Sequence, residues 1–346
     1  MDYRRIQSRG WRKLFLLIIF LFSLFFLCGC GKNLQPVVFP LKKPYLAYFS
    51  PQDSLYPHLV YLIREARESV YAAFYKIELK EVSRALIEAH ERGVKVRVFT
   101  DDLTSYDKGS QFGELNEFHL IKKDKDPESL MHHKFCLIDE EIVWTGSFNP
   151  TSKGSFKENN NAVVIKSRTL AAEFMKEFEK LWEGKPLSPA NFSHSQISLN
   201  GTQAEAYFSL HDNPEEAIVR ELEKAKESIH FALFTFTSPE IAHALIHKFA
   251  ENVEVKGIME KEQDSSFSQY RSLKKLRMPV EQDGNFYFMH HKFFIIDKNI
   301  VITGSFNPTW RANYQNRENL LIIQSSSLAA QYEEEFTRLW KEAVKF

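Results

Sequence analysis

One motif, His-x-Lys-x4-Asp-x6-Gly-Ser-x-Asn, occurs twice in this chain at a constant offset of 158 residues. The first copy consists of His132, Lys134, Asp139, Gly146, Ser147 and Asn149, and the second of His290, Lys292, Asp297, Gly304, Ser305 and Asn307. One copy could be chance or half of a site. Two complete copies at one spacing indicate a duplicated unit whose halves face each other and share one site.

The repeat extends well beyond the motif. Ala47 to Ser50 recurs as Ala206 to Ser209 at an offset of 159, and Leu181-Trp182 recurs as Leu339-Trp340 at an offset of 158. A period of this length indicates a duplicated domain and not a solenoid array. The predicted organisation is a signal segment at 1–30, a tether at 31–44, a first repeat at 45–184, a linker at 185–203 and a second repeat at 204–346.

The N-terminal segment has the composition of an export signal. Five basic residues lie between Arg4 and Lys13, and the run from Leu14 to Leu27 is apolar except for one Ser. This order is typical of a secretory signal, and Leu27-Cys28-Gly29-Cys30 resembles a bacterial lipobox with Cys30 as the lipidated residue. An uncleaved signal anchor is the alternative, although the apolar run is shorter than the about 20 residues of a spanning helix. Both alternatives predict an exported protein held on a membrane, facing the periplasm or the cell exterior.

Cysteine content and charge narrow the function. Without Cys28 and Cys30, only Cys136 remains, and its apolar neighbours predict a small buried side chain with no disulfide. Residues 31–346 contain about four more acidic than basic side chains. Proteins that hold nucleic acid usually have a basic surplus, so this balance weakens a nuclease hypothesis without excluding it.

Strand and helix patterns alternate along each repeat. In the first repeat we expect strands at 45–49, 69–75, 94–99, 131–138 and 142–145, and helices at 55–67, 78–91 and 170–182. This alternation predicts an α/β fold with at least partly parallel pairing. We expect most of the Phe side chains in the core, with Phe148 and Phe306 at the mouth of a pocket.

The motif places chemically useful groups on one surface. Side chains alternate along a strand, so His132 and Lys134 share a face while His133 points away, and the second copy repeats this arrangement. Lys supplies positive charge for a phosphate, and Ser and Asn donate hydrogen bonds to its oxygens. Of two imidazoles, one can attack phosphorus while the other protonates the leaving oxygen. The pattern therefore predicts a phosphodiester site.

These residues resemble the HKD motifs of the phospholipase D superfamily, over nearly all of residues 45–344. The resemblance implies two tandem α/β lobes with mixed sheets flanked by helices, related by a pseudo-twofold axis around one active site. It also implies a phosphohistidine intermediate, no cofactor and no metal. It assigns Asp139 and Asp297 a supporting role within the catalytic motif. A metal site at the paired histidines is the alternative, which the nearby lysines oppose.

The two repeats differ at one position that bears on the mechanism. Glu318 of the second repeat aligns with Asn160 of the first. A carboxylate raises the pKa of an imidazolium beside it, so a histidine paired with Glu318 is expected to be the acid. With each partner assigned to its own repeat, His132 is predicted as nucleophile and His290 as general acid. A local shift that brings Glu158 into the role of Asn160 would undo this argument.

The leading hypothesis is a membrane-tethered enzyme that hydrolyses a phospholipid headgroup phosphodiester. The alternatives are an exported or surface nuclease that cleaves DNA or RNA, and a non-catalytic surface binding module. We expect a monomer, because the duplication supplies an internal pseudo-dimer. The expected site consists of His132, Lys134, Asp139, His290, Lys292 and Asp297, supported at the phosphate by Ser147, Asn149, Ser305, Asn307 and Glu318.

Overall fold

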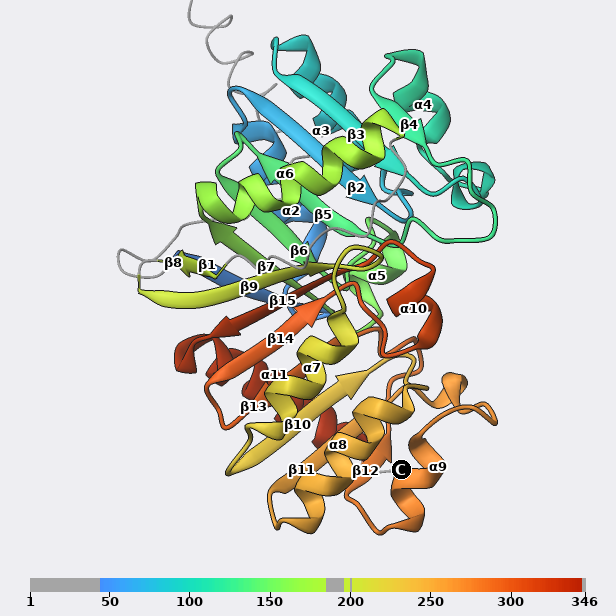
Figure 1. Ribbon diagram of the computed structural model, residues 1–346. Coiled ribbons are helices and arrows are strands. Elements are labelled where there is room, and N and C mark those ends of the chain that lie inside the picture. Colours follow the sequence, from blue (N-terminus) through green and yellow to red (C-terminus); the bar gives the residue numbers. More distant parts are fainter. Residues whose placement is uncertain (1–43, 185–195, 200, 344–346) are drawn as a thin grey trace, which may run out of the picture. The chain divides into compact units, whose positions relative to one another are not determined.

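Alternating strands and helices build both repeats, as the sequence pattern predicts (Figure 1). The computed structural model describes residues 44–184, 196–199 and 201–343. The predicted signal segment and its Cys30 lie outside these residues. Within the described part of the chain, no helix has the length and apolar character needed to cross a bilayer.

The first repeat contains thirteen elements. They are β1 (Tyr45–Ser50), α2 (Leu55–Glu65), β2 (Ser69–Phe74), α3 (Lys80–Glu91), β3 (Lys95–Thr100), η1 (Thr104–Tyr106), α4 (Phe112–Glu117), β4 (Ile121–Lys123), β5 (Lys134–Ile138), β6 (Ile142–Gly146), α5 (Ser152–Phe156), β7 (Asn160–Lys166) and α6 (Arg168–Glu183).

The second repeat follows the same order, with one additional strand at its start. Its elements are β8 (Ile197–Leu199), β9 (Thr202–Phe208), α7 (Pro214–Glu223), β10 (Ser228–Leu233), α8 (Pro239–Ala250), β11 (Glu254–Met259), η2 (Lys261–Gln263), α9 (Tyr270–Lys275), β12 (Val280–Gln282), β13 (Lys292–Ile296), β14 (Ile300–Gly304), α10 (Trp310–Tyr314), β15 (Asn319–Gln324) and α11 (Ser326–Ala343). Strand β8 lies within the segment expected to be linker and pairs with β9.

Local sequence signals explain several helix ends. Helix α6 begins after Ser167, whose side chain accepts a hydrogen bond from the Leu170 amide, and ends at Gly184 in the left-handed conformation. Helix α8 has Pro239 at its start, directly after the capping residue Ser238. The capping residues in the sequence therefore determine where these helices begin and end.

Each repeat forms one mixed sheet, and the two sheets have equivalent topologies. The first has the order β1-β7-β6-β5-β2-β3-β4, and the second has the order β12-β11-β10-β13-β14-β15-β9-β8. Strands β2, β3 and β4 pair in parallel, as do β10, β11 and β12, while the other pairings are antiparallel. The prediction of an α/β fold with partly parallel pairing is confirmed.

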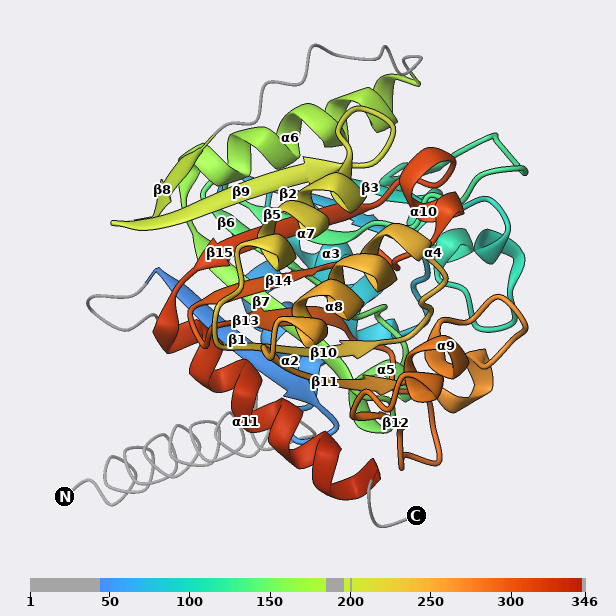
Figure 2. The same ribbon diagram turned by 60° about the horizontal axis from the view of Figure 1, so that its bottom comes forward.

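The long C-terminal helices of the two repeats cover the sheet faces that meet at the centre. Helices α7 and α8 lie side by side on one face of the second sheet, and α11 lies on the other (Figures 1 and 2). Helix α11 also contacts β1 of the first repeat, and α6 contacts β9 of the second. One core cluster includes buried residues from both sheets and both long helices, for example Phe135, Phe174, Phe293 and Phe336. The repeats thus share a hydrophobic core, and all described residues belong to one compact unit.

The strand pairings bring the two motifs to one edge of each sheet, here called the site edge. Phe74 at the end of β2 pairs with Lys134 at the start of β5, and Gly146 at the end of β6 pairs with Ala162 near the start of β7. The connections after β2, β3 and β6 and before β5 therefore lie at this edge. The equivalent pairings of the second sheet do the same.

Candidate active site

His132 and His290 are held in place by the backbone of the opposite repeat. The His132 amide donates to the carbonyl of Arg317 (2.9 Å), and the His290 amide donates to the carbonyl of Asn159 (2.8 Å). Isolated bridges pair Met131 with Arg317 and Met289 with Asn159. Both motif histidines therefore lie where the two repeats meet.

Each imidazole is anchored through Nδ1 to a side chain of the opposite repeat. His132 Nδ1 lies 2.8 Å from the Glu318 carboxylate, and His290 Nδ1 lies 2.8 Å from the amide oxygen of Asn160. Both histidines are 9% exposed. Anchoring through Nδ1 leaves Nε2 of each ring to face a substrate.

This cross-pairing corrects the sequence argument about roles. Each partner was assigned to the histidine of its own repeat, but the structure exchanges them. Glu318 holds His132, and Asn160 holds His290. The Glu158 carboxylate accepts a hydrogen bond from the Asn160 amide nitrogen at 3.4 Å, while Asn160 itself contacts His290, so Glu158 does not replace Asn160. Each partner is therefore distant in sequence from the histidine that it contacts.

Lys134 and Lys292 are buried beside the histidines. Lys134 Nζ donates to the His132 carbonyl (2.8 Å), and Lys292 Nζ donates to the His290 carbonyl (2.6 Å). Burial lowers the pKa of Lys134 to about 7. Burial, followed by the charge of Lys134, lowers the pKa of Lys292. Burying two ammonium groups in one site without a negative charge nearby raises the free energy of the folded protein. This arrangement therefore favours the binding of an anionic ligand.

The same environment acts on the imidazoles. Burial is the main cause that lowers the pKa of both His132 and His290, and the charges of both lysines lower it further. Burial also raises the pKa of Glu318 to about 7. The His132–Glu318 pair therefore takes up a proton near neutrality. Each lysine acts on both histidines, so the two half-sites form one electrostatic unit.

The motif serines support the histidine partners. Ser147 Oγ donates to the Asn160 amide oxygen (2.9 Å) and accepts from the Asn161 amide (3.0 Å). In the second repeat, Ser305 hydrogen-bonds the Glu318 side chain and accepts from the Asn319 amide (2.9 Å). Each serine contacts its histidine only through an intermediate residue. This contact corresponds to the predicted supporting role of the serines and not to their predicted binding of phosphate.

Asn149 and Asn307 remain available to a substrate. The side-chain oxygen of each is buried and lacks a hydrogen-bond partner among the described residues. Asn307 and Glu318 both line a pocket of about 370 Å³. Each of these oxygens is an acceptor, so a hydroxyl group or a water molecule in the site can donate a hydrogen bond to it.

The motif aspartates lie away from the histidines, at the opposite ends of the strands. Asp139 accepts hydrogen bonds from the backbone amides of Arg67, Glu68 and Ser69 (2.7–3.1 Å). Asp297 accepts the equivalent bonds from residues 226–228. Strand β5 separates Asp139 from His132 by roughly 20 Å at about 3.3 Å per residue. Both aspartates therefore support the fold at the far ends of the strands, whereas the family resemblance implies that they support the site by hydrogen bonds.

The second histidine of each pair points into the shared core. His133 Nε2 lies 3.2 Å from Glu177, and His291 Nε2 lies 3.0 Å from Glu335. Burial alone would raise the pKa of Glu177. Hydrogen bonds from His133 and His211 nevertheless hold this pKa well below its usual value. The predicted division between catalytic and structural histidines is consistent with these contacts.

Four aromatic side chains near the site differ from the sequence-based expectation or were not part of it. Phe148 and Phe306 are buried in the core instead of lining a mouth, with at most 1% exposure. Tyr75 packs against His132 with ring centroids 5.0 Å apart, and Phe234 packs against His290 at 4.7 Å. These two aromatics align at the repeat offset of 159, so comparison of the repeats could have found them. Cys136 is buried, as predicted.

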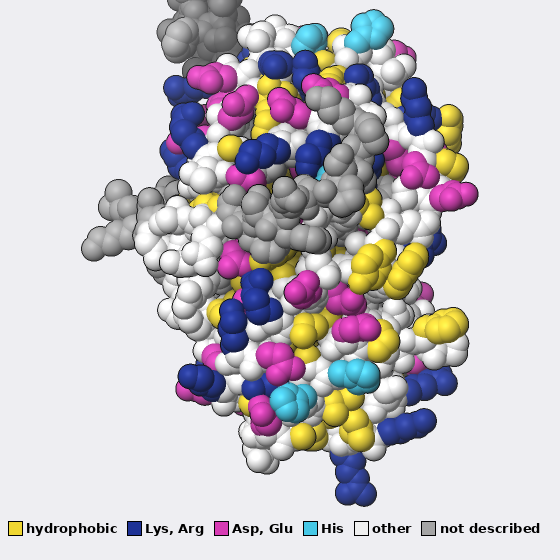
Figure 3. All heavy atoms as spheres, in the orientation of Figure 1, with side chains coloured by type: hydrophobic (Ala, Val, Ile, Leu, Met, Phe, Trp, Pro, Cys, Tyr) yellow, Lys and Arg dark blue, Asp and Glu magenta, His cyan; other side chains and the backbone are white. Residues whose placement is uncertain are grey.

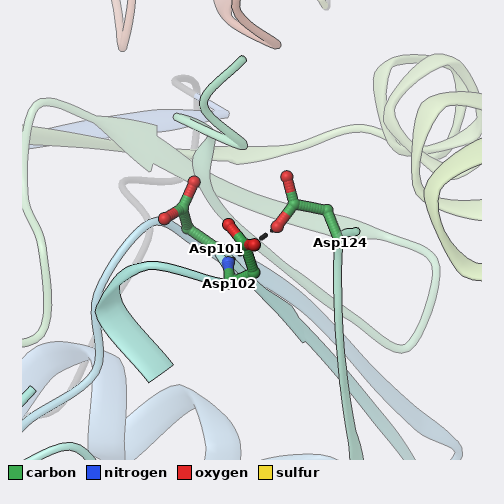
Figure 4. A group of neighbouring side chains, drawn as sticks. All are labelled: Asp101, Asp102 and Asp124. Carbon is green, nitrogen blue, oxygen red and sulfur yellow. Dashed lines mark hydrogen bonds between the residues drawn. The ribbon is translucent and has the colours of Figure 1, made fainter. Parts of the chain in front are cut away.

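A cluster of three carboxylates lies beside the site and consists of Asp101, Asp102 and Asp124 (Figure 4). Their oxygens lie within 4.8 Å of one another, which makes them the candidate metal ligands among the described residues. Two of them already hold loops: Asp101 accepts from the Met131 amide (3.0 Å), and Asp124 accepts from the Asp102 amide (2.7 Å). Glu260 repeats the first contact at Met289 (2.6 Å). Asp101 and Glu260 therefore position the residue that precedes each motif histidine.

Paired His and Lys side chains between two mixed α/β sheets define a class of phosphodiesterases with one site per two repeats. The sequence matches the family described as "Cardiolipin synthase, PLD-like domain" over residues 59–182 and again over residues 218–340. The chain therefore belongs to the phospholipase D superfamily, as a phospholipase D-like phosphodiester hydrolase.

Relatives and solved structures agree with this placement. The mitochondrial cardiolipin hydrolase of Mus musculus is 31% identical over 187 residues, which are 54% of this chain and 77% of that protein. The phospholipase D of Rickettsia conorii is 32% identical over 148 residues, 42% of this chain and 74% of that protein. The crystal structure of phosphatidylserine synthase from Haemophilus influenzae matches with a TM-score of 0.67 over 86% of each chain at 12% identity, which supports the fold alone.

Proposed function

We propose that this protein hydrolyses a phospholipid headgroup phosphodiester through a covalent phosphohistidine. The observation that carries the proposal is the joining of two imidazoles and two buried lysines into one electrostatic unit. Such a site favours a ligand with negative charge and offers two nitrogens for nucleophilic and acid–base work.

The proposed reaction has two steps. In the first, His132 Nε2 attacks phosphorus and forms an N–P bond, while the bond from phosphorus to the leaving oxygen breaks and His290 gives its Nε2 proton to that oxygen. In the second, water attacks phosphorus, the N–P bond breaks, and His290 Nε2 takes the proton of the water. Lys134, Lys292, Asn149 and Asn307 stabilise the phosphoryl oxygens in both steps.

The exchanged partners support His132 as the nucleophile, for a reason that differs from the sequence argument. Attack places a positive charge on the nucleophilic imidazole, and that charge persists as long as the intermediate. Glu318 next to His132 Nδ1 stabilises it. A general acid must release its proton, and the neutral Asn160 beside His290 holds that proton less strongly than a carboxylate.

Two further observations support a lipid as the substrate. Relatives named cardiolipin hydrolase and phospholipase D match the chain. The part of the chain after residue 30 has no basic surplus for a polyanion. Cleavage of nucleic acid, the alternative expected from sequence, becomes an outcome of the assay.

An N-terminal lipid on Cys30 would hold the enzyme beside such a substrate on a membrane that faces the periplasm or the cell exterior. The support is the basic and apolar order of residues 4–27 followed by Cys30. Incorporation of a labelled fatty acid that is lost in Cys30→Ala would agree with this anchor. Incorporation that persists in Cys30→Ala would contradict it.

The substrate assay compares phosphatidylcholine vesicles with single- and double-stranded oligonucleotides, each with and without a chelator. We expect release of the headgroup alcohol and phosphatidic acid, with no loss of rate when chelator is added. Cleavage of oligonucleotide without cleavage of lipid would overturn the proposed substrate. Replacement of either His132 or His290 by Ala is the matched control and should lower the rate by at least about 100-fold.

A further inference from the structure

Five aromatic side chains of the described residues are more than half exposed. They are Tyr106 (80%), Phe267 (78%), Phe286 (86%), Trp310 (63%) and Tyr314 (53%). We call this set the aromatic rim. Large apolar side chains at such exposure usually mark a surface that binds something.

The whole aromatic rim lies at the site edge of the two sheets. Tyr106 follows β3, Phe267 follows β11, Phe286 precedes β13, and Trp310 and Tyr314 follow β14. Hydrophobic side chains gather on the side of the molecule that carries α10 (Figure 3). Phe118 and Leu276, which are 39% and 49% exposed, instead precede β4 and β12 and lie toward the other edge.

The aromatic rim is continuous with the catalytic groups. Phe267 and Trp310 line the same pocket of about 370 Å³ as Glu318, the partner of His132. On the other side, Phe288 packs on Phe234 (5.5 Å between centroids), which packs on His290 (4.7 Å). A ligand that covers the aromatic rim would therefore cover the entrance to the site.

The charges around the entrance decide between two kinds of ligand. Aromatic side chains stack on nucleic-acid bases when a basic groove follows the backbone. Here, carboxylates outnumber Lys and Arg in the connections of the site edge, which are 75–79, 101–110, 124–133, 147–159, 234–238, 260–269, 283–291 and 305–318. Phe side chains have no polar atom to place in water, whereas Trp and Tyr prefer the boundary between water and a bilayer.

We propose that the aromatic rim inserts into the headgroup region of a phospholipid bilayer and places the site over its lipid substrate. This inference rests on the proposed function and names the physical form of its substrate. Because the contact is apolar and not electrostatic, it does not need anionic lipids, and salt leaves it unchanged.

The test uses the full chain with Cys28 and Cys30 replaced by Ser and a polarity-sensitive dye on Phe267→Cys or Phe286→Cys. Phe118→Cys and Leu276→Cys are the matched controls. With phosphatidylcholine vesicles, we expect a blue shift and quenching by brominated acyl chains at positions 267 and 286 only. Dye at a fixed position reports insertion there, whether or not the N-terminal segment also binds the vesicle.

Equal responses at the rim and control positions would overturn the proposal. A response to a single-stranded oligonucleotide but not to vesicles would overturn it as well and would indicate a nucleic-acid surface. Hydrolysis of the soluble diester bis-p-nitrophenyl phosphate by the unlabelled chain tests the proposed function separately. Absent hydrolysis with a positive dye response would refute the chemistry, whereas hydrolysis without the response would refute the surface.

Discussion

Glu318 and Asn160 give two identical motifs different surroundings. Their positions are equivalent in the two repeats, and each reaches the histidine of the other repeat at 2.8 Å. One replacement of a carboxylate by an amide is therefore sufficient to separate the roles of His132 and His290.

The pH dependence of kcat/KM should report this pair. Burial raises the pKa of Glu318 to about 7, so the His132–Glu318 pair gains a proton as pH falls through 7 and Nε2 is no longer free. Burial lowers the pKa of Lys134 to about 7, so its charge is lost as pH rises. We expect a bell-shaped profile near neutrality.

Glu318→Gln should move both limbs of that profile to lower pH. Without the carboxylate, the burial and lysine charges that lower the pKa of His132 are no longer opposed, so the acid limb shifts to lower pH. The charge of Glu318 also raises the pKa of Lys134, so its loss shifts the alkaline limb in the same direction. Loss of a charged hydrogen bond should also reduce kcat by about 10- to 100-fold. An acid limb that stays in place in this variant would show that another group controls it.

Asp139→Ala should weaken the fold while sparing the chemistry. The change removes hydrogen bonds to three backbone amides, which predicts a loss of roughly 1.5–3 kcal/mol in the free energy of unfolding. Urea unfolding measures this loss, and kcat below the melting temperature should change by less than about tenfold. A far larger fall in kcat with an unchanged free energy of unfolding would make Asp139 catalytic.

At the residue scale, the spacing of the motif residues was sufficient to predict the directions in which neighbouring side chains point. Alternation along an extended segment predicts that His132 and Lys134 share a face while His133 points away, although the regular strand begins only at Lys134. The partners of the histidines could not be found in this way, because a contact between Glu318 and His132 joins residues from different repeats. Their pairing depends on how the two sheets meet.

At the element scale, a close contact between neighbouring strands controls the geometry of the site. Gly146 ends β6 at a φ of +152°, where an added Cβ would lie 2.3 Å from the Asn161 carbonyl oxygen. Gly304 has the same geometry against Asn319. The Gly of each motif therefore lets β6 approach β7, which begins with Asn160, and lets β14 approach β15, which begins directly after Glu318.

Gly146→Ala should disturb both stability and catalysis. The clash with β7 would move Asn160, the partner of His290, and should reduce the free energy of unfolding by about 1–3 kcal/mol. Gly113→Ala in α4 is the matched control, because its Cβ would meet nothing within 4 Å. Calorimetry and turnover rates measure both effects. Equal, small changes in the two variants would contradict this role for Gly146.

Helices and strands of this chain were largely predictable, whereas their ends and the linker were not. The predicted strand from Met131 begins only at Lys134, because the preceding residues bond with the opposite repeat. Ile197–Leu199 form β8 through pairing with β9. Both differences arise from partners that lie elsewhere in the fold and leave no periodic signal.

At the scale of the whole molecule, the two repeats complete each other. They share one core cluster, and each supplies the backbone and side-chain partners of the other's histidine. The duplication visible in sequence predicted a shared site. The exposed aromatic rim was not predictable, because the number of Phe residues in the sequence does not show which of their side chains are buried.

A mixture of His132→Ala and His290→Ala chains should remain inactive. Each variant alone should lose about 100- to 10,000-fold in rate, because one imidazole of the site is missing. Since both histidines of a site come from one chain, mixing cannot rebuild it. Recovered activity would show that a site is assembled between two chains.

The most direct test is to trap the covalent intermediate with a short-chain phospholipid during turnover and to locate the phosphorylated residue by mass spectrometry. The two-histidine mechanism with exchanged partners predicts the phosphatidyl group of the substrate on His132 and none on His290. A phosphatidyl group on His290, or enzyme denatured in alkali during turnover, where the N–P bond survives, that carries no such group, would contradict it.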